Sequence, residues 1–557
     1  MPVHVKVSLV VTALIIFIIT YIFIGLRQIP RIRIDRPAGA LVGAVLMVVA
    51  GVLTLDQAFA AIDMHTLLLL LGMMIITVYL RTAGFFELMA DKILSLSRTP
   101  FQLLIFVVLS SGLLSALFVN DTICLLYTPI ILEVTVQLGV NPMPYLLALA
   151  TSSNIGSVMT VTGNPQNMLI GIYSKIPYLS FLGALFPVAL AGFLVIILVI
   201  RVLYRGDMAA DKFPERPVMP DYYVRKTLLI KSLLVCAGVL AAFSLGYPYS
   251  LTAAAGAIVL LLIGRASTQR IFEGVDWTLL LFFSGLFVVM RGVEVSGLAG
   301  AAITWMGDLS VLSPTGRIAG LSLVSMILSN VVSNVPAVML LKPLTLSLGG
   351  DNILWLALAM SSTLAGNFTL IGSVVNLIVA QQARRKVEIG FMEYFRVGAL
   401  ITAITIAIGI LVLAAEVKLA SGAEFTVARQ ESPTRVKVTS SDPAVAERTF
   451  RVVLTCDTDT LRTRGLQGFR RLKPDEAALF IFEDLVAVTF WMGTVAFPID
   501  IVFVGQDRKV NRVYRNCKPG SLDLYRSGKP VLWVMETAAG SGIRVGDRVQ
   551  IPGQGKE

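Results

Sequence analysis

Charge and histidine are scarce in this 557-residue chain. Only 15% of the residues are Asp, Glu, Lys or Arg, whereas a soluble domain usually holds about 25%. The two histidines, His4 and His65, are too few for a histidine-ligated metal site, so no metal is expected. Four cysteines without a CxxC pair argue against a disulfide scaffold.

Long apolar segments are abundant instead. Hydrophobic residues make up 56% of the chain, and the mean hydropathy is +0.80. Several segments approach or exceed the roughly 20 residues that cross a bilayer core of about 30 Å. The plainest are Val7–Leu26, Ala38–Leu55, Leu67–Leu80, Phe181–Tyr204, Leu228–Leu245 and Val397–Ala415. The first segment ends in Arg27 without a small-residue cleavage site, which favours a retained span over a signal peptide.

The net charge of +11 does not require a nucleic-acid partner. Cytoplasmic loops of membrane proteins carry a surplus of Lys and Arg, and the sequence holds no DNA- or RNA-reading motif. We therefore expect a multi-pass membrane protein, all-α in its membrane part, with the lipid bilayer as its main partner and no nucleic acid.

The chain contains two copies of one repeat, about 7–204 and 227–416, within a transmembrane domain of residues 1–420. A shift of 213 residues aligns a series of markers, and a shift of 209 aligns the later part of each copy. The first shift pairs Gly43 with Gly256, Asp63 with Asp276, Gly72 with Gly285, and Asp121 with Asn334. The second pairs Thr160, Gly163 and Asn167 with Thr369, Gly372 and Asn376. An ordered set of this kind predicts an internal duplication.

Each copy is predicted to hold a helix–turn–helix of apolar half-spans and then a helix broken by polar residues. If the half-spans are re-entrant hairpins, each copy crosses the membrane five times, so the copies form an inverted repeat with about ten crossings. This topology places three basic loops in the cytoplasm and both chain termini outside. The loops are Arg27–Arg36, Arg205–Lys226 and Arg384–Lys386.

The hairpin tips are the first candidate ion- or substrate-binding site. Helix ends at membrane depth leave backbone groups free, and Ser, Thr and Asn add neutral oxygens suited to Na⁺ or to an oxyanion. The tips read Asn120-Asp121-Thr122 and Ser333-Asn334-Val335. A carboxylate among apolar residues needs a partner, a cation or a proton, so Asp121 is the candidate coupling residue. The alternative is that Asp121 only caps a helix that starts at Thr122.

The two broken helices are the second candidate site. Glycine and proline permit a helix to unwind, and unwound backbone exposes carbonyls to cations and N–H groups to anions. The residues are Ser152, Ser153, Asn154, Thr160, Gly163, Asn164 and Asn167 in the first copy, and Ser361, Ser362, Thr363, Thr369, Gly372 and Asn376 in the second. The alternative is packing of small residues between helices. Outside both sites, Lys342 and Glu133 are expected near the membrane surface, and Arg291 is expected to pair with Glu294.

At these residues the chain resembles the ion transporter superfamily of arsenite permeases, sodium–proton antiporters and citrate or dicarboxylate transporters. The resemblance covers about residues 30–415. It is carried by Phe118-Val119-Asn120-Asp121, Ser153-Asn154-Ile155-Gly156, Gly163-Asn164-Pro165-Gln166-Asn167, Ser329–Pro336 and Gly366–Gly372. It implies an inverted repeat with two re-entrant hairpins, a homodimer and elevator-like alternating access. The tips depart from the Ser-Asn-Thr of dicarboxylate carriers, which favours the arsenite-permease-like branch.

Residues 421–557 alternate apolar and polar residues and predict a soluble β-rich domain. Predicted strands are Phe450–Leu454, Ala478–Phe482, Val486–Trp491, Ile499–Val504 and Val531–Met535. The region resembles the domain-of-unknown-function family one-nine-two at Arg464-Gly465-Leu466, Phe490-Trp491-Met492, Pro498-Ile499-Asp500 and Val545–Val549. The resemblance implies an extracytoplasmic location. In that compartment Cys456 and Cys517 are candidates for a disulfide.

The sequence favours a secondary transporter in the plasma membrane that moves a small anion, an arsenite-like oxyanion or a carboxylate. The driving ion would be H⁺ or Na⁺, and no other cofactor is expected. A sodium–proton antiporter and a membrane anchor or sensor for the C-terminal domain, with an unknown partner, are the alternatives. An enzyme is not expected, because no nucleophile, metal cluster or acid–base pair stands at one depth.

Overall fold

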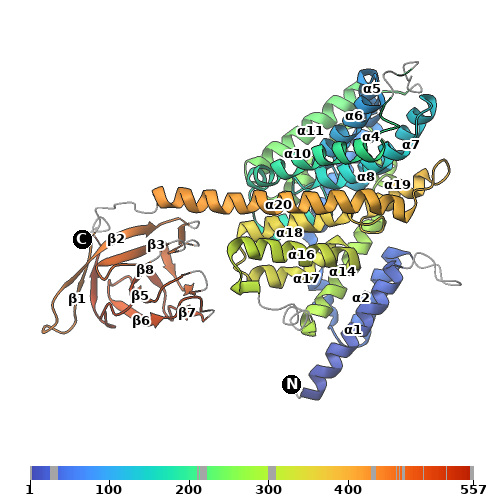
Figure 1. Ribbon diagram of the computed structural model, residues 1–557. Helices are drawn as coiled ribbons and strands as arrows, with labels where there is room; N and C mark the ends of the chain where they lie inside the picture. The colour runs from blue at the N-terminus through green and yellow to red at the C-terminus, as the bar shows by residue number, and fades with distance from the viewer. Residues whose placement is uncertain are drawn as a thin grey trace. The chain divides into compact units, whose positions relative to one another are not determined.

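The computed structural model describes residues 3–25, 35–209, 213, 222–298, 309–427, 435–458, 461–462, 465–466, 469, 471–492, 495–521 and 523–551. The chain divides into two compact units, Met1–Glu416 and Val417–Glu557, drawn in Figure 1. Of the predicted cytoplasmic loops, Arg27, Arg31 and Arg33 lie outside the described residues, as does most of the stretch between Arg205 and Lys226.

The first repeat is entirely helical where the structure describes it. Its helices are α1 (Val3–Gly25), α2 (Arg36–Val49), α3 (Leu55–Ala61), α4 (Met64–Thr82), α5 (Phe85–Leu96), α6 (Pro100–Leu117), α7 (Asn120–Gln137), α8 (Met143–Ser157), α9 (Pro165–Ser174) and α10 (Tyr178–Leu203). Local signals set their starts: the side chains of Asp63 and Thr99 accept hydrogen bonds from backbone N–H groups in the first turns of α4 and α6. The predicted span Ala38–Leu55 ends early, at Val49, because Gly51 adopts a left-handed φ of 72°.

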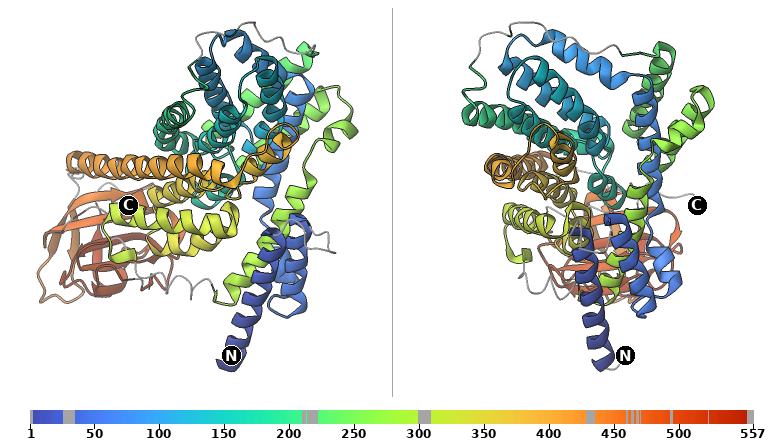
Figure 2. Two further views of the ribbon diagram at one scale, coloured as in Figure 1. Left: turned by 45° about the vertical axis from the view of Figure 1, so that its right-hand side comes forward. Right: turned by 90° about the vertical axis from the view of Figure 1, so that its right-hand side faces the viewer.

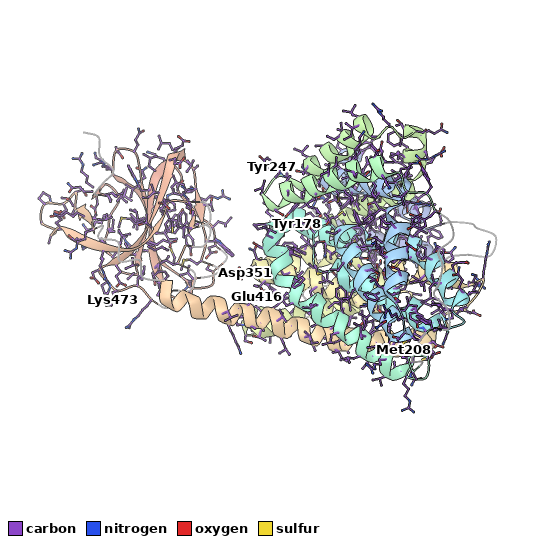
Figure 3. The ribbon with its side chains drawn as sticks, turned by 90° about the horizontal axis from the view of Figure 1, so that it is seen from above. Tyr178, Met208, Tyr247, Asp351, Glu416 and Lys473 are labelled. Carbon is purple, nitrogen blue, oxygen red and sulfur yellow. The ribbon has the colours of Figure 1, made fainter. Side chains whose placement is uncertain are left out.

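The second repeat has the same order of elements. They are α11 (Lys226–Ser244), α12 (Tyr249–Ile263), α13 (Thr268–Glu273), α14 (Trp277–Val295), η1 (Leu309–Val311), α16 (Pro314–Val332), α17 (Asn334–Ser347), α18 (Asn352–Leu364), η2 (Ala365–Asn367), α19 (Val374–Ala383) and α20 (Phe391–Val427). Figure 2 shows α16, α17 and α18 packed side by side. Aromatic rings join the repeats: Tyr178 of α10 (labelled in Figure 3) lies 5.7 Å from Phe243 and 6.4 Å from Tyr249 between ring centroids.

The two repeats contact each other reciprocally. Gly72 of α4 packs so tightly against α12 that an added Cβ would lie 2.6 Å from the backbone carbon of Ala253. Gly285 of α14 packs in the same way against α2, where the distance to the backbone carbon of Ala40 would be 2.8 Å. The two glycines are 213 residues apart, and so are the two alanines. A side chain at either glycine would separate the repeats, which explains the matched glycines of the sequence.

Each repeat contains the predicted helical hairpin, but the structure corrects its alignment. The hairpins correspond at a shift of 214, which pairs the first-turn prolines Pro100 and Pro314 and the in-helix prolines Pro129 and Pro343. Asn334 therefore corresponds to Asn120, and the prediction that it corresponds to Asp121 was wrong. The counterpart of Asp121 is an apolar residue, Val335.

The broken helices are also present. In the first repeat, residues 158–164 interrupt the helix between α8 and α9, and the Asn164 side chain caps α9 by accepting from the N–H of Asn167 at 2.8 Å. In the second, η2 and residues 368–373 separate α18 from α19. Seven described helices are long and apolar enough to cross a membrane, including the hairpin helices α6 and α16. The number of crossings stays a prediction.

The second unit is a β-domain. Its strands are β1 (Arg435–Thr439), β2 (Arg448–Cys456), β3 (Glu476–Val486), β4 (Thr489–Phe490), β5 (Ile499–Val504), β6 (Val510–Cys517), β7 (Tyr525–Arg526), β8 (Val531–Ala538) and β9 (Arg548–Gln550). Seven form one sheet in the order β6-β5-β8-β3-β2-β1-β9, in which only the β2–β3 pair is parallel. A bridge between Lys509 and Arg548 brings the ends of the sheet together, so the sheet closes on itself.

Alternate residues of the central strands enter two hydrophobic clusters on opposite faces of this sheet. In β5, Ile501 and Phe503 belong to one cluster and Val502 and Val504 to the other. This double burial explains why Ile499–Val504 could be predicted correctly as a strand. The predicted strand Val486–Trp491 was wrong in extent: only Thr489 and Phe490 form a short strand there, paired with β7.

The hypothesised disulfide does not form. Cys456 and Cys517 are both buried free thiols, on β2 and β6, with three strands between them in the sheet. Neighbouring strands lie about 4.8 Å apart, and a disulfide needs Cα atoms within about 7 Å. Burial raises the pKa of the Cys517 thiol to about 11, so it stays protonated at neutral pH.

Candidate transport site

Asn154, at the end of α8, is the centre of a buried polar network where the two repeats meet. Its amide nitrogen donates to the side-chain oxygens of Asn367 at 2.8 Å and Asn376 at 3.2 Å, both from the second repeat. Its amide oxygen accepts from Asn120 at 3.1 Å and from Ser373 at 3.2 Å. Two donations and two acceptances satisfy the whole amide, so its orientation is fixed.

Thr363 of α18 occupies the matching position of the second repeat and makes the reciprocal contacts. Its hydroxyl accepts from the amides of Asn164 and Gln166, both at 3.2 Å, and donates to Asn167 at 3.4 Å. The shift of 209 that pairs Asn154 with Thr363 also pairs Asn376 with Asn167. Each repeat therefore sends one polar side chain into the broken helix of the other.

An equivalent asparagine helps to hold the interrupted backbone in each repeat. Asn167 donates to the carbonyls of Ser157 at 2.9 Å and Thr160 at 3.0 Å. Asn376 donates to the carbonyls of Gly366 at 2.7 Å and Thr369 at 3.0 Å. These carbonyls have lost their helical partners at the break, and the asparagines satisfy them inside the membrane unit.

The first hairpin is bonded to its own broken helix along its length. The hydroxyls of Ser111 and Ser152 lie 2.6 Å apart, and those of Ser115 and Ser153 lie 2.7 Å apart. The tip itself is held where the N–H of Asn120 donates to the Gly163 carbonyl at 3.0 Å. Thr160 also donates to the carbonyl of Ala116, near the end of α6.

The second hairpin carries the matching serines without the matching bonds. Ser325 and Ser329 of α16 are buried, and their hydroxyls have no hydrogen-bond partner among the described residues. The same is true of the Asn334 side-chain oxygen at the tip, although this residue is only 8% exposed. Among the described residues, Asn330 alone bonds this hairpin to its broken helix: it donates to the Ala365 carbonyl at 3.1 Å and accepts from Thr369 at 3.1 Å.

Asp121 lies beside the network rather than in it. It stands in the first turn of α7, which begins at Asn120 and not at Thr122, so the prediction that Asp121 caps this helix was wrong. Its backbone N–H donates to the Asn120 side chain at 3.1 Å. The half-buried carboxylate makes no hydrogen bond or ion pair within the described part of the chain. Thr122 is likewise half-buried at the tip.

Most of the predicted site residues come together, and a few do not. Ser361 and Ser362 are buried but donate to carbonyls of their own helix, α18. Ser333 lies between α16 and α17 with a φ of 73°, a strained value for a non-glycine residue. Gly163 and Gly372 lie in the breaks. An added Cβ on Gly372 would lie 2.8 Å from the Asn330 side-chain oxygen.

Gln166, Asn330, Asn367 and Ser373 belong to the network but were not among the assigned site residues, although the first three lie in the motifs that carry the family resemblance. Ser373 could have been found by applying the shift of 209 to Asn164. Asn367 and Asn330 had no such signal, because their counterparts Val158 and Ala116 are apolar. Every member of the network is neutral, so it offers amide and hydroxyl groups and no fixed charge.

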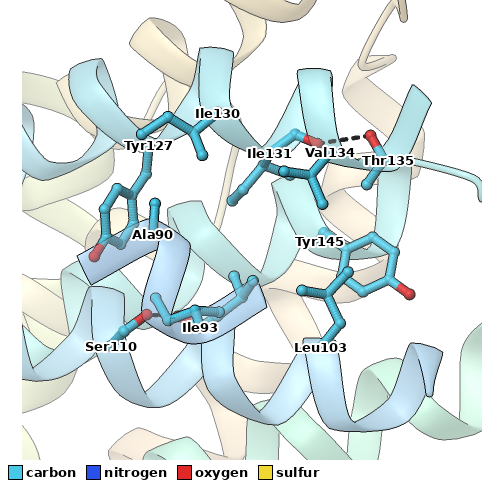
Figure 4. Close-up of a pocket in the computed structure, with 11 residues that line it drawn as sticks. Ala90, Ile93, Leu103, Ser110, Tyr127, Ile130, Ile131, Val134, Thr135 and Tyr145 are labelled. Atoms are coloured by element: carbon cyan, nitrogen blue, oxygen red, sulfur yellow. Dashed lines mark hydrogen bonds between the residues drawn. The ribbon is translucent and has the colours of Figure 1, made fainter. Parts of the chain in front are cut away.

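Two of the cavities in the membrane unit differ in chemistry. A cavity of about 30 Å³ between α5, α6, α7 and α8 is lined by apolar groups around Tyr127 and Tyr145 (Figure 4). A larger cavity of about 650 Å³ is lined by α3, α4, α9, α14 and α17 and includes charged side chains. Both touch helices that begin at the polar network: α7 lines the smaller cavity, and α9 and α17 line the larger one.

Comparison with known proteins places these features in a family. Residues 12–360 match the citrate transporter family, and residues 441–551 match an uncharacterized family, DUF192. The silicon efflux transporter LSI3 of Oryza sativa subsp. japonica is 34% identical over 69% of this chain and 93% of its own length. A transporter named arsB from Dictyostelium discoideum is 24% identical over 71% of this chain and 91% of its own.

Among solved structures, the YdaH transporter of Alcanivorax borkumensis is similar with a TM-score of 0.47 and 15% identity. The match covers 74% of the present chain and 98% of the YdaH chain. With apolar helices long enough to cross a membrane, the protein is a multi-pass membrane transporter. The chain belongs to the citrate transporter family and carries a C-terminal DUF192 domain.

Proposed function

We propose that this transporter carries a small, partly protonated oxyanion of the arsenite or silicate type, coupled to H⁺ or Na⁺. The observation that carries the proposal is the neutral network between the repeats, with the acceptor oxygen of Asn334 unpartnered at its edge among the described residues. A buried acceptor without a partner costs about 1–3 kcal/mol, so a hydroxyl-bearing substrate that donates to it would be stabilised there.

The chemistry of the network supports a small oxyanion over a multiply charged carboxylate. Amide and hydroxyl side chains can donate to the oxygens of an oxyanion and accept from its hydroxyl groups. They therefore suit a substrate that carries both hydrogen-bond acceptors and donors. A dicarboxylate that is fully ionised offers only acceptors and brings two charges into a site with no fixed cation among its described residues. The names of the two relatives, silicon efflux and arsB, agree with a small oxyacid.

Asp121 supplies the proposed coupling group. A carboxylate at membrane depth that makes no hydrogen bond or ion pair with the described residues has a strong tendency to take up a proton or a cation. The same residue favours the second candidate function, a sodium–proton antiporter, in which Na⁺ and H⁺ compete for this carboxylate and the neutral oxygens nearby.

The two candidates are separated by electrogenic uptake in proteoliposomes. Arsenite, silicate, phosphate, sulfate, succinate and citrate are each offered with and without a Na⁺ or pH gradient. A gradient-dependent current for one oxyanion, lost in Asp121→Asn, supports the carrier. Currents that follow Na⁺ or pH steps alone and ignore every anion support the antiporter. If a variant without transport kept the full phenotype of the wild type, the membrane unit would instead be an anchor or sensor for the C-terminal domain.

The location follows from the same proposal. We place the protein in the plasma membrane, with both termini outside and the chain acting as a homodimer. Single cysteines at Tyr247 and at Arg384 test the orientation, because a membrane-impermeant thiol reagent should label intact cells only at Tyr247, which is 60% exposed. Labelling at Arg384 but not at Tyr247 would reverse the topology.

A further inference from the structure

We propose that the cavity of about 650 Å³ is a water-filled vestibule for anions, in which Lys342 attracts the substrate towards the network. This inference rests on the proposed function for the identity of the substrate, but its electrostatic part can be tested without any substrate. The cavity is lined by α3, α4, α9, α14 and α17.

The position of the cavity connects it to the network. Helix α17 begins at Asn334, and Lys342 lies about 12 Å further along the helix axis at about 1.5 Å per residue. Helix α9 carries Asn167 in its first turn and presents Tyr173 to the cavity about 9 Å further along. Two helices thus start at the network and reach the cavity, so a solute in the cavity is about two helical turns from Asn334.

The charges of the lining do not contribute equally. Arg291 and Glu294 pair at 2.7 Å, so each largely neutralises the other. Asp63 accepts from the N–H of Thr66 at 3.0 Å and compensates the positive end of α4. His65 contacts the Ser250 hydroxyl at 3.1 Å through Nδ1. Among the described lining residues, Lys342 is then the one cation without an anionic partner, and Asp63 is the one anion without a cationic partner.

Lys342 makes no ion pair with a described residue. Its ammonium lies 3.7 Å from the centroid of the Tyr173 ring, a cation–π contact that holds it at the cavity without cancelling its charge. Its counterpart in the first hairpin, by the shift of 214, is the neutral residue Thr128. The cation therefore marks one hairpin only, and a positive charge without an anionic partner attracts anions into the cavity.

The test uses a cysteine placed at Met339, a half-buried lining residue one turn before Lys342. Anionic and cationic methanethiosulfonate reagents of similar size are applied to the full-length protein at low ionic strength. A unit charge about 7 Å away changes the local concentration of a charged reagent roughly threefold to tenfold. We expect Lys342→Gln to slow the anionic reagent by that factor and to accelerate the cationic one.

Three further controls sharpen the result. Lys342→Arg keeps the positive charge and should keep the labelling rates of the parent. If the lysine acted only through its shape and packing, the longer arginine would change these rates. Lys92→Gln removes an exposed lysine on α5, away from the cavity, and should change nothing. Added salt should reduce the difference between parent and Lys342→Gln.

Transport provides the second readout. Lys342→Gln should raise the KM for the transported anion by a similar factor and leave the maximal rate unchanged. Equal labelling rates in the parent and in Lys342→Gln, or no labelling of the Met339 cysteine by either reagent, would overturn the vestibule. If labelling behaves as expected but no anion is transported by the wild type, the vestibule stands and the proposed substrate class fails.

Discussion

The two hairpins of this transporter have the same architecture but different bonding. The first is tied to its broken helix by two serine pairs and by the Asn120 tip. The second keeps serines at the matching positions, Ser325 and Ser329, yet their hydroxyls and the Asn334 oxygen make no bond with a described residue. Duplication preserved the residues, while the contacts became specialised.

One substitution between the repeats accounts for part of this difference. Asn154 accepts from Asn120 in the first repeat, but its counterpart Thr363 has no amide oxygen to offer Asn334. The hydroxyl of Thr363 is also occupied by Asn164 and Gln166. The Asn334 oxygen lacks a partner for a separate reason: the matching Asn120 oxygen accepts from the N–H of Asp121, whereas no described donor reaches the Asn334 oxygen. We propose that a substrate hydroxyl supplies that donor.

Removing the centre of the network should have the largest effect. Asn154→Ala deprives four side chains of their partner, and each buried polar group left unsatisfied costs about 1–3 kcal/mol. We expect uptake to fall below detection and the melting temperature to drop markedly. Thr363→Val, the matched variant, breaks longer hydrogen bonds of 3.2–3.4 Å. It should reduce uptake and the melting temperature less than Asn154→Ala does. A more severe loss from Thr363→Val would show that the second repeat carries the fold.

Asp121→Asn should separate coupling from folding. The carboxylate makes no hydrogen bond or ion pair with a described residue, so the isosteric amide should leave the melting temperature within about 1 °C of the wild type's while gradient-driven uptake falls more than about tenfold. Glu133→Gln is the control, because this exposed carboxylate faces Lys386 at 3.8 Å and should be neutral for transport. Unchanged gradient-driven uptake in Asp121→Asn would make Asp121 structural.

The two hairpin tips should respond oppositely to alanine. Asn120→Ala removes a bonded amide and should lower the free energy of unfolding by about 1–3 kcal/mol. Asn334→Ala removes an oxygen that has no partner among the described residues, so we expect little loss of stability but a rise in the KM of about tenfold, the equivalent of one hydrogen bond. Thermal unfolding and uptake kinetics of Asn120→Ala and Asn334→Ala test this contrast. Equal destabilisation of both variants would remove the contrast between the tips.

The serine stripes should show the smallest difference. Ser115→Ala breaks the bond to Ser153 and should cost about 1 kcal/mol. Ser329→Ala removes a buried hydroxyl that has no partner among the described residues, and it should be neutral or slightly stabilising. Denaturation in detergent can compare the two. A greater cost for Ser329→Ala would mean that this hydroxyl is bonded in the protein.

Much of the membrane fold could be predicted because the two repeats keep the same residues at matching positions. Gly72 and Gly285 pack against matched alanines, and the asparagines that hold the breaks, Asn167 and Asn376, occupy equivalent positions. The hairpin register could not be predicted as well. Gly and Asp markers supported a shift of 213, but the insertion of one residue before Pro314 changes it to 214, and only the helix bounds revealed this.

The network was harder to predict than the fold. Asn367 and Asn330 have apolar counterparts, so the repeat offered no reason to include them, and their partners lie far away in the sequence. In the C-terminal domain, the mainly apolar segment Ile499–Val504 indicated a strand correctly, whereas the cysteines carried no information about the distance between them. A sequence pattern predicts an element well, but pairing across a sheet depends on the topology.

The contrast between the hairpins implies that the second tip receives the substrate and the first does not. Single cysteines at Ser333 and at Thr122, both half-buried at their tips, test this directly by their rates of thiol labelling with and without the transported oxyanion. We expect saturating substrate to slow labelling at Ser333 by at least about fivefold, the protection that one bound solute gives a neighbouring thiol at about 80% occupancy, and to leave Thr122 within about twofold. Protection confined to Thr122, or absent from both tips, would contradict substrate binding at the second hairpin.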